Sequence, residues 1–255
     1  MLQTPDDPDD SLVHVASLPG VAEAVERAWT AVDGLRRHRV LRRSADRVAT
    51  ESVLRGARAS AALAGVDLPL ESVRTSDAAD LDPVMQAAFR VAAESVHLLA
   101  VWSRAPMQVV ARLHSVAAAG LVPSAELGRP AVGTAPRLAA LGAVLSCRTT
   151  APALVVAAVA HAEVASMQAF PVAGDLVARA VGRLTLVARG LDPTSVSVPE
   201  VGHVELGRDA YLDALAGYVG GGEAGLRAWV VHCADAVVLG AREGVAICEG
   251  IQRGS

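Results

Sequence analysis

The chain has 255 residues, of which 52% are hydrophobic and only 3% are aromatic. This length allows a substantial buried core, and the many small aliphatic side chains favour closely packed helices. The formal net charge of −4 argues against general nucleic-acid binding, while the acidic N-terminus and short apolar runs argue against secretion and membrane insertion. We therefore expect an all-α protein of the cytoplasm that is not bound to a membrane.

The first part of the chain predicts a tail followed by two helices. Residues 1 to about 18 are acidic and contain proline, a composition typical of a disordered tail. Apolar residues at helical spacing then predict a helix that starts near Pro19: Val21, Val25, Trp29 and Val32. A second, arginine-rich helix is expected from about Leu35 to Leu63, with Gly65 beyond its end and Gly56 as a weak point within it.

The arginine-rich segment Arg36–Arg47 holds six arginines and a single acidic residue, Asp46. The favoured interpretation is a solvated helix face on which the arginine stems cover apolar neighbours. The alternative is a surface for an acidic partner. No aromatic side chains are interleaved to stack bases, which makes nucleic acid the least favoured partner.

Helix signals are clearest in the middle of the chain. Asp82 and Pro83 predict a helix start, because Asp is a good N-cap and Pro suits the first helical position. Another helix is expected from Pro106 to Gly120, followed by a loop over 121–136 that is rich in Gly and Pro. Further helices are expected near 137–146, 152–167, 176–188, 208–219 and 224–250, with residues 192–203 extended. The sequence therefore predicts about nine helices in one unit.

The stretch QAFPVAGDLVAR, residues 168–179, resembles the HPFxxGNGRxxR signature of the Fic/Doc (Fido) family without a gap. Phe170 and Arg179 match it identically, and His161 lies where the preceding AHxxFxxIHPF text of many Fic proteins has its histidine. Upstream, Ser60–Gly65 reads SAALAG and resembles the SSxIEG text of the family's inhibitory helix. The resemblance implies a Fic-like helical core over 81–251, preceded by N-terminal helices over 19–80 that include a degenerate inhibitory-like helix.

The resemblance also implies a role for each signature position, and most of the required side chains are missing. Gln168 stands where the family has its general base, and a carboxamide accepts no proton near neutral pH. Val172 replaces the acidic residue that helps to hold Mg²⁺, and Leu176 replaces the first arginine. The glycine turn becomes Ala173-Gly174-Asp175, and we expect Asp175 to cap the helix and occupy the amides that would cradle phosphate.

Two groups of residues keep part of the family's pattern. A vestigial anion-binding site is expected from four residues: Gly174, Asp175, Arg179 and Arg183. An intrahelical salt bridge with a cap is the favoured alternative for the charged members of this set. The inhibitory-helix position is Ser60, Ala64 and Gly65, with Ala64 in place of the family's glutamate.

The resemblance with these departures predicts a degenerate Fic-domain protein without adenylyltransferase activity. We expect a binding or regulatory module for an unidentified protein partner, with no catalytic residue, cofactor or metal, and a homodimer stays open. The alternative is a divergent Fic-type transferase that uses ATP or another nucleotide with Mg²⁺. That enzyme would move AMP or another phosphate-containing group onto a protein hydroxyl, with His161 or His114 as the base.

The remaining polar residues indicate structural roles. Cys147, Cys233 and Cys248 have no CxxC spacing and are expected to be reduced, buried small hydrophobes. His232 and Asp235 lie three residues apart on a predicted helix, and we expect a hydrogen-bonded core pair, because no further metal ligands stand at suitable spacing.

Overall fold

The structure is a computed structural model that describes residues 11–254. Within this range the chain forms twelve α-helices and one short 3₁₀ helix, without a β-strand, so the all-α fold class is confirmed. The helices are α1 (Ser11–Ser17), α2 (Val21–Arg36), α3 (Leu41–Leu63), α4 (Leu70–Thr75), α5 (Pro83–Trp102), α6 (Pro106–Ala117), η1 (Ser124–Glu126), α7 (Ala135–Ser146), α8 (Ala153–Ser166), α9 (Gly174–Ala188), α10 (Pro199–Leu206), α11 (Arg208–Gly220) and α12 (Gly222–Arg253).

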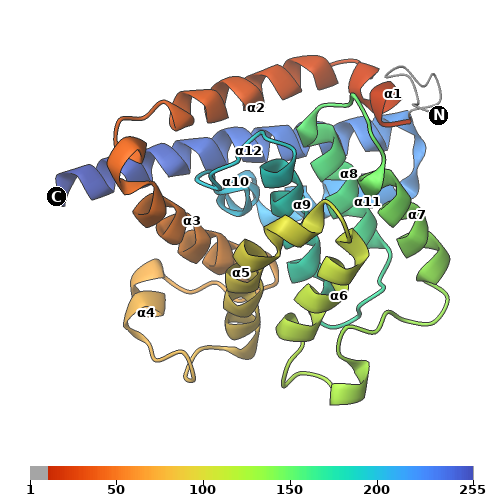
Figure 1. Ribbon diagram of the computed structural model, residues 1–255, viewed down its shortest axis with the longest axis horizontal. Coiled ribbons are helices and arrows are strands. Elements are labelled where there is room, and N and C mark those ends of the chain that lie inside the picture. The colour runs from red at the N-terminus through yellow and green to blue at the C-terminus, as the bar shows by residue number, and fades with distance from the viewer. Residues whose placement is uncertain (1–10, 255) are drawn as a thin grey trace.

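Helix α9 is at the centre of the molecule. It packs against α8, α5, α6 and α3 (Figure 1). Residues on nearly all sides of α9 are buried, as expected for a helix that is covered by neighbours in every direction. The core around it is formed mainly by aliphatic side chains, including Met85, Leu113, Leu176, Val177 and Val181. This core fixes the position of the segment that carries the signature.

The long helix α12 joins the N-terminal helices to the rest of the fold. It lies along α2 and also packs against α3, α8, α10 and α11 (Figure 1). Leu35, Ile247 and Trp229 are fully buried in the cores that α12 shares with these helices. Helices α2 and α3 of the segment 19–80 are therefore packed against the C-terminal helix.

Helices α10 and α12 approach each other closely enough to require glycine. A Cβ atom placed on Gly202 would lie 1.9 Å from the carbonyl oxygen of Ala236, and one on Gly240 would lie 2.5 Å from that of Val198. Distances this short cannot be relieved by rotating a side chain, because the obstructing atoms belong to the backbone. The backbones of α10 and α12 are therefore in direct contact.

The helix start predicted from Asp82 and Pro83 is confirmed, but two expectations near the N-terminus are wrong. The N–H of Val84 donates to Asp82 Oδ1 over 2.7 Å at the start of α5. The expected tail covers helix α1, where Leu12 and Val15 are buried, because the acidic residues precede this apolar segment; residues 1–10 lie outside the described range. The expected helix over 35–63 is interrupted between Arg36 and Leu41.

Two further differences come from side-chain size and from proline. Trp29 is 51% exposed, and the buried face of α2 is formed instead by Val21, Ala24, Ala28, Val32 and Leu35. Small alanines allow α2 to lie close to its neighbours, so the largest side chain faces outward. Residues 192–203, expected to be extended, contain the start of α10, with Pro199 at its first helical position.

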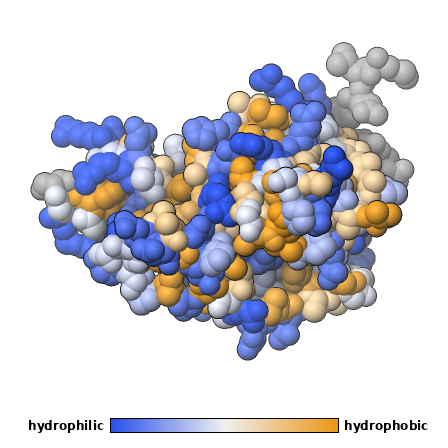
Figure 2. Space-filling model, turned by 90° about the horizontal axis from the view of Figure 1, so that it is seen from below, coloured by the Kyte–Doolittle hydropathy of each residue, from blue (hydrophilic) through white to orange (hydrophobic). Residues whose placement is uncertain are grey.

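One described helix, α5, is long and apolar enough to cross a membrane by length and composition alone. In the fold it packs against α3, α6 and α9, with Met85, Ala88 and Val91 buried. Hydrophobic and hydrophilic residues are interspersed over the face of the molecule in Figure 2.

Candidate functional site

The signature loop, residues 167–173, connects α8 to α9. Gln168 is exposed and has a left-handed backbone with φ 47°, while Phe170 is buried and stacks on His114 with ring centroids 4.2 Å apart. The N–H of Ala131 donates to the carbonyl of Ala169 over 2.7 Å. Ala173 is also left-handed, with φ 59°, a conformation that favours the glycine that the family signature has there. Ala169 and Phe170 therefore hold the loop against the fold, while Gln168 is exposed to solvent.

Helix α9 begins at Gly174, one or two residues earlier than expected, so Asp175 lies in its first turn rather than before it. The residue at the cap position, Ala173, has no side-chain acceptor. Asp175 Oδ2 accepts from Arg179 Nη2 over 2.8 Å instead. The expected capping by Asp175 is wrong, whereas the expected intrahelical salt bridge is confirmed.

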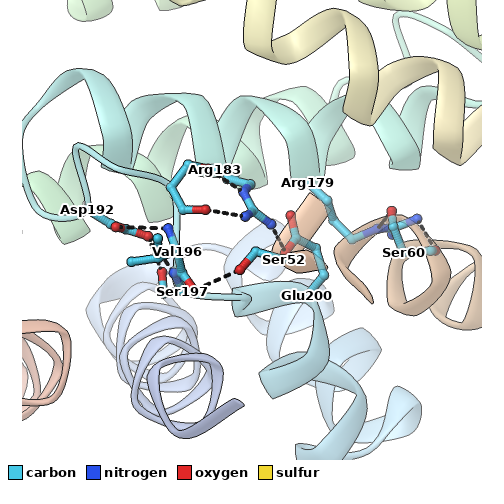
Figure 3. A network of polar contacts seen from close by, with 9 residues as sticks. Ser52, Ser60, Arg179, Arg183, Asp192, Val196, Ser197 and Glu200 are labelled. Carbon is cyan, nitrogen blue, oxygen red and sulfur yellow. Dashed lines mark hydrogen bonds and ion pairs between the residues drawn. The ribbon is translucent and has the colours of Figure 1, made fainter. Parts of the chain in front are cut away.

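Arg179 is buried and fully engaged by its neighbours (Figure 3). Its Nε donates to Ser60 Oγ over 2.7 Å, and its Nη2 donates to the Ser60 carbonyl over 2.9 Å. Burial alone would lower the pKa of Arg179, but Tyr211 and Asp175 raise it above its usual range. The guanidinium therefore stays charged inside the fold, because hydroxyl, carbonyl and carboxylate oxygens surround it.

The inhibitory-helix position meets Arg179 at the last turn of α3. Ser60 makes the contact, and the same Ser60 carbonyl accepts from the N–H of Ala64 over 3.3 Å. Gly65 follows with φ 98°, a left-handed conformation that ends the helix. The structure thus brings this position and the signature arginine together, although Ser60 rather than Ala64 is the contacting residue.

Arg183, one turn after Arg179, bonds in another direction. Its Nη1 donates to Glu200 Oε2 over 2.9 Å, and its Nε and Nη2 donate to the hydroxyl and carbonyl of Ser195, each over 3.0 Å. Figure 3 shows this second network beside that of Arg179, with Asp192 holding the segment before α10. Arg183 therefore does not form one anion site with Gly174, Asp175 and Arg179, and sequence reasoning had assigned no role to Glu200.

The other signature positions carry apolar side chains. Leu176 is buried in the core around α9, and Val172 is 38% exposed on the signature loop. Neither brings a charge to the loop, so the side chains of 168, 172 and 176 supply no carboxylate or guanidinium there.

The two histidines considered as alternative bases are both buried. His114 Nδ1 accepts from the N–H of Gly128 over 3.0 Å, and burial lowers the pKa of its imidazole. His161 Nε2 lies 2.9 Å from Tyr211 Oη, and burial, with the charge of Arg179, lowers its pKa to about 3. Such a weakly basic imidazole is poorly suited to take a proton from a hydroxyl.

Behind His161 lies a buried group of aromatic and titratable side chains from α8, α10, α11 and α12. The rings of His161 and Trp229 meet edge to face at 5.1 Å, and His203 Nδ1 lies 3.0 Å from His232 Nε2. The expected pair of His232 with Asp235 is wrong, because Asp235 accepts from Arg27 over 2.9 Å. The neighbouring α10, which was not predicted, offers His232 its partner instead.

Three of these side chains could hold a metal ion, and we call them the histidine–cysteine cluster: His161, His203 and Cys233. One nitrogen of each imidazole and the Cys233 sulfur all lie within 4.8 Å of one another, and all three residues are buried. They line a cavity of about 30 Å³. The absence of a metal signal in the sequence has a simple cause: the residues come from three separate helices, α8, α10 and α12, so no local spacing links them.

The cysteines are all free, but they do not share one environment. Cys233 and Cys248 are buried, as expected, and burial raises the pKa of both thiols. The expectation is wrong for Cys147, which is exposed. It directly follows the last residue of α7, where the chain leaves the surface of that helix.

A larger, mostly apolar cavity of about 240 Å³ lies between α3, α5 and α9. Its lining includes Gly56 and Ser60 on α3 and Ala180 and Leu184 on α9. A Cβ atom on Gly56 would lie 2.7 Å from an Arg183 guanidinium nitrogen, so Gly56 is a point of close contact rather than a weak point in α3.

The arginines of the segment Arg36–Arg47 are all exposed. Arg37 pairs with Asp33 over 2.7 Å, and Arg39 Nε donates to Gln252 over 3.2 Å. The segment spans the end of α2 and the start of α3 and forms a basic surface.

Neither a protein-family profile nor a curated protein matches the chain. Solved structures do match it. A Fic family protein from Desulfovibrio desulfuricans G20 superposes with a TM-score of 0.70 at 20% identity, over 96% of this chain and 77% of that protein. Fic-1 from C. elegans (residues 134–508) superposes with a TM-score of 0.66 at 16% identity, over 98% of this chain and 80% of that one.

Proposed function

Because the chain has a Fic-like fold, we propose that it is a degenerate Fic-domain protein that binds or regulates a protein partner without transferring AMP. The observation that carries this proposal is the environment of Arg179. It is the one arginine of the signature that remains, and Ser60, Asp175 and Tyr211 already surround it.

A nucleotide phosphate would have to compete with these contacts. Asp175 lies in the first turn of α9, where its carboxylate would repel a phosphate approaching the helix amides. Arg179 is pinned to the last turn of α3, so the guanidinium would have to break two bonds with Ser60 before it could reach a ligand. Both features support a site closed to nucleotide.

The groups that would perform the transfer are also missing. A positioned general base contributes on the order of 10²–10⁴-fold to such reactions. Gln168 occupies the position of the general base, and its carboxamide accepts no proton near neutral pH. The alternative bases, His114 and His161, are buried and have lowered pKa values. This supports a module without catalysis over the divergent transferase.

A regulatory module needs a surface for its partner. The basic surface of Arg36–Arg47 is exposed and lies at the junction of α2 and α3. Its charge suits an acidic segment of another protein.

The transferase assay is the direct test. The full chain is incubated with ATP labelled at the α-phosphate and Mg²⁺, alone and with cell extract, beside a Fic protein that has the complete signature. We expect no label on the chain or on other proteins. Label that appears with this chain and disappears in Arg179→Ala would overturn the proposal.

A binding measurement tests the closed site separately. Calorimetric titration with ATP should give no heat of binding for the unmodified chain. Asp175→Asn removes the repulsive charge and the ionic part of the contact with Arg179, and we expect it to bind ATP more tightly than the unmodified chain. Asp209→Asn, in the first turn of α11, is the matched control and should leave binding undetectable. Tight binding by the unmodified chain would contradict the closed site.

A further inference from the structure

We propose that the histidine–cysteine cluster is a binding site for a divalent transition-metal ion of the zinc type. The ion would join α8, α10 and α12 in the core of the protein. This proposal is independent of the proposed function, because none of the three ligands belongs to the signature loop.

The geometry of the cluster suits one small ion. The three donor atoms lie within 4.8 Å of one another, a spread that small movements reduce to the separations found around a tetrahedral ion. The adjoining cavity of about 30 Å³ is large enough for a single water, which needs roughly 10–15 Å³. Three protein ligands and one water complete a four-coordinate site.

Each histidine is held by a neighbour through one nitrogen only. Tyr211 Oη lies 2.9 Å from His161 Nε2, and His232 Nε2 lies 3.0 Å from His203 Nδ1. In the proposed site, the other nitrogen of each ring would bind the metal. Hydrogen bonds of this kind fix the orientation and tautomer of metal-binding histidines in proteins. The cluster thus has its three ligands together with the residues that would orient two of them.

The donor atoms determine which ion is expected. Imidazole nitrogen and thiolate sulfur suit Zn²⁺ and related ions, whereas Mg²⁺ and Ca²⁺ require oxygen ligands. Cys233 would bind as the thiolate, and its negative charge offsets part of the charge of the ion.

The neighbouring arginines do not oppose a cation with unpaired charge. Arg179 and Arg183 line the same cavity, but Asp175 lies 2.8 Å from the first and Glu200 lies 2.9 Å from the second.

The test uses cobalt(II) alone as the probe, added to full-length protein that has been stripped with a chelator. The variant Cys147→Ser/Cys248→Ala leaves Cys233 as the only thiol. We expect it to bind one equivalent of cobalt and to show both thiolate-to-cobalt charge-transfer absorption and the strong visible bands of four-coordinate cobalt. Added Zn²⁺ should bleach these bands.

Substitution of the ligands should abolish the signal. In the same background, Cys233→Ala should lose the charge-transfer band, and His203→Gln should lose the strong visible bands. His97→Gln, on an exposed part of α5, is the matched control and should leave the spectrum unchanged. If Cys233→Ala does not fold, the single-thiol protein still decides, because its only possible thiolate ligand is Cys233.

His232 is a positioning residue in this proposal. His232→Phe keeps an aromatic ring at this position but removes the hydrogen bond to His203. We expect the affinity for cobalt to fall by roughly 10–100-fold, while the absorption bands of bound cobalt stay the same. Absence of a charge-transfer band in the single-thiol protein would overturn the proposal. So would equal cobalt binding before and after Cys233→Ala.

Discussion

The signature loop follows α8, and the same helix carries His161 of the histidine–cysteine cluster, but the two regions differ in the type and the burial of their polar side chains. At the loop, Gln168 and Val172 face solvent and offer no titratable group. In the cluster, two imidazoles and a thiol are enclosed in the core around a small cavity. The segment that resembles a known reaction site therefore lacks titratable side chains at these positions. The residues that could bind a metal lie in the core behind it, and no sequence motif marks them.

The largest effect is expected from a substitution of Gly202, which directly precedes the cluster residue His203 on α10. A methyl group at this position would overlap the backbone of Ala236, so we expect Gly202→Ala to destabilise the protein by roughly 3 kcal/mol or more. Gly34→Ala, at an open position within α2, should instead stabilise by up to about 1 kcal/mol. Urea denaturation measures both. Equal stability of Gly202→Ala and the unmodified protein would mean that α10 does not bring His203 to α12.

Arg179, which is buried, and Arg183, which is half-buried, offer a matched pair of substitutions on α9. Arg183→Ala leaves the Glu200 side chain, which is 8% exposed, without its ionic partner, and we expect a loss of about 3 kcal/mol. Arg179→Ala leaves the Asp175 side chain, which is 47% exposed, so water can compensate and the loss should be smaller, about 1–2 kcal/mol. Denaturation of both variants gives the order, and the reverse order would contradict the burial of Glu200.

Acid should weaken the cluster before it affects the loop. The pKa of His161 is lowered from 6.5 to about 3 in the fold, so below about pH 6.5 the unfolded chain binds more protons than the folded one. Stability is fully present above this pH and falls by about 1.4 kcal/mol per unit as the pH decreases toward 3. Between about pH 7.5 and about pH 5, metal-free protein should therefore lose about 2 kcal/mol through His161, and more through His203, whose pKa burial also lowers.

The pH series needs a variant to assign the loss. His161→Gln should make the dependence less steep, because one buried imidazole no longer takes up a proton on unfolding, while His203 still does. An equal slope in His161→Gln and in the unmodified protein would place the acid sensitivity elsewhere.

The smallest effect is expected from a substitution of Ala173, whose backbone conformation in the signature loop is left-handed. Ala173 has φ 59°, a conformation that costs a non-glycine residue about 1–2 kcal/mol. After the entropy cost of glycine is subtracted, Ala173→Gly should stabilise the protein by about 0.5–1 kcal/mol. Ala139→Gly, on an exposed part of α7, should destabilise it by about 1 kcal/mol. The same sign for both would argue against a left-handed Ala173.

Local signals predicted much of the fold. Asp82 and Pro83 marked the start of α5 because capping depends on neighbours in sequence. The break between α2 and α3 carries no Gly or Pro, so nothing in the sequence distinguished it from a continuous helix. Helix α10 was missed because the preceding SVSV alternates like a strand, and the helix is stabilised by packing against α12 and α3, which are distant in the sequence.

The candidate site could be predicted only at the residues that resemble family motifs, namely 168–179 and Ser60–Gly65. The likeness of Ser60–Gly65 to an inhibitory helix placed it near Arg179, and the two are in contact. Glu200, by contrast, contacts Arg183 only because the fold places α10 beside α9. The cluster includes His203 on α10, and this helix was not predicted from the sequence. Contacts between distant helices depend on packing, and no spacing in the sequence encodes them.

The position of α12 bears on how the protein is made. Helix α2 leaves the ribosome before α12, yet the helix that covers its apolar face is formed by residues 222–253. While the residues between the two helices are synthesised, α2 therefore lacks this partner, and the nascent chain presents the apolar face to chaperones or to other nascent chains. Slowing synthesis between α2 and residue 222 should prolong this exposure, so yield in the cell should respond to codon choice in the part of the gene that encodes the residues between α2 and α12.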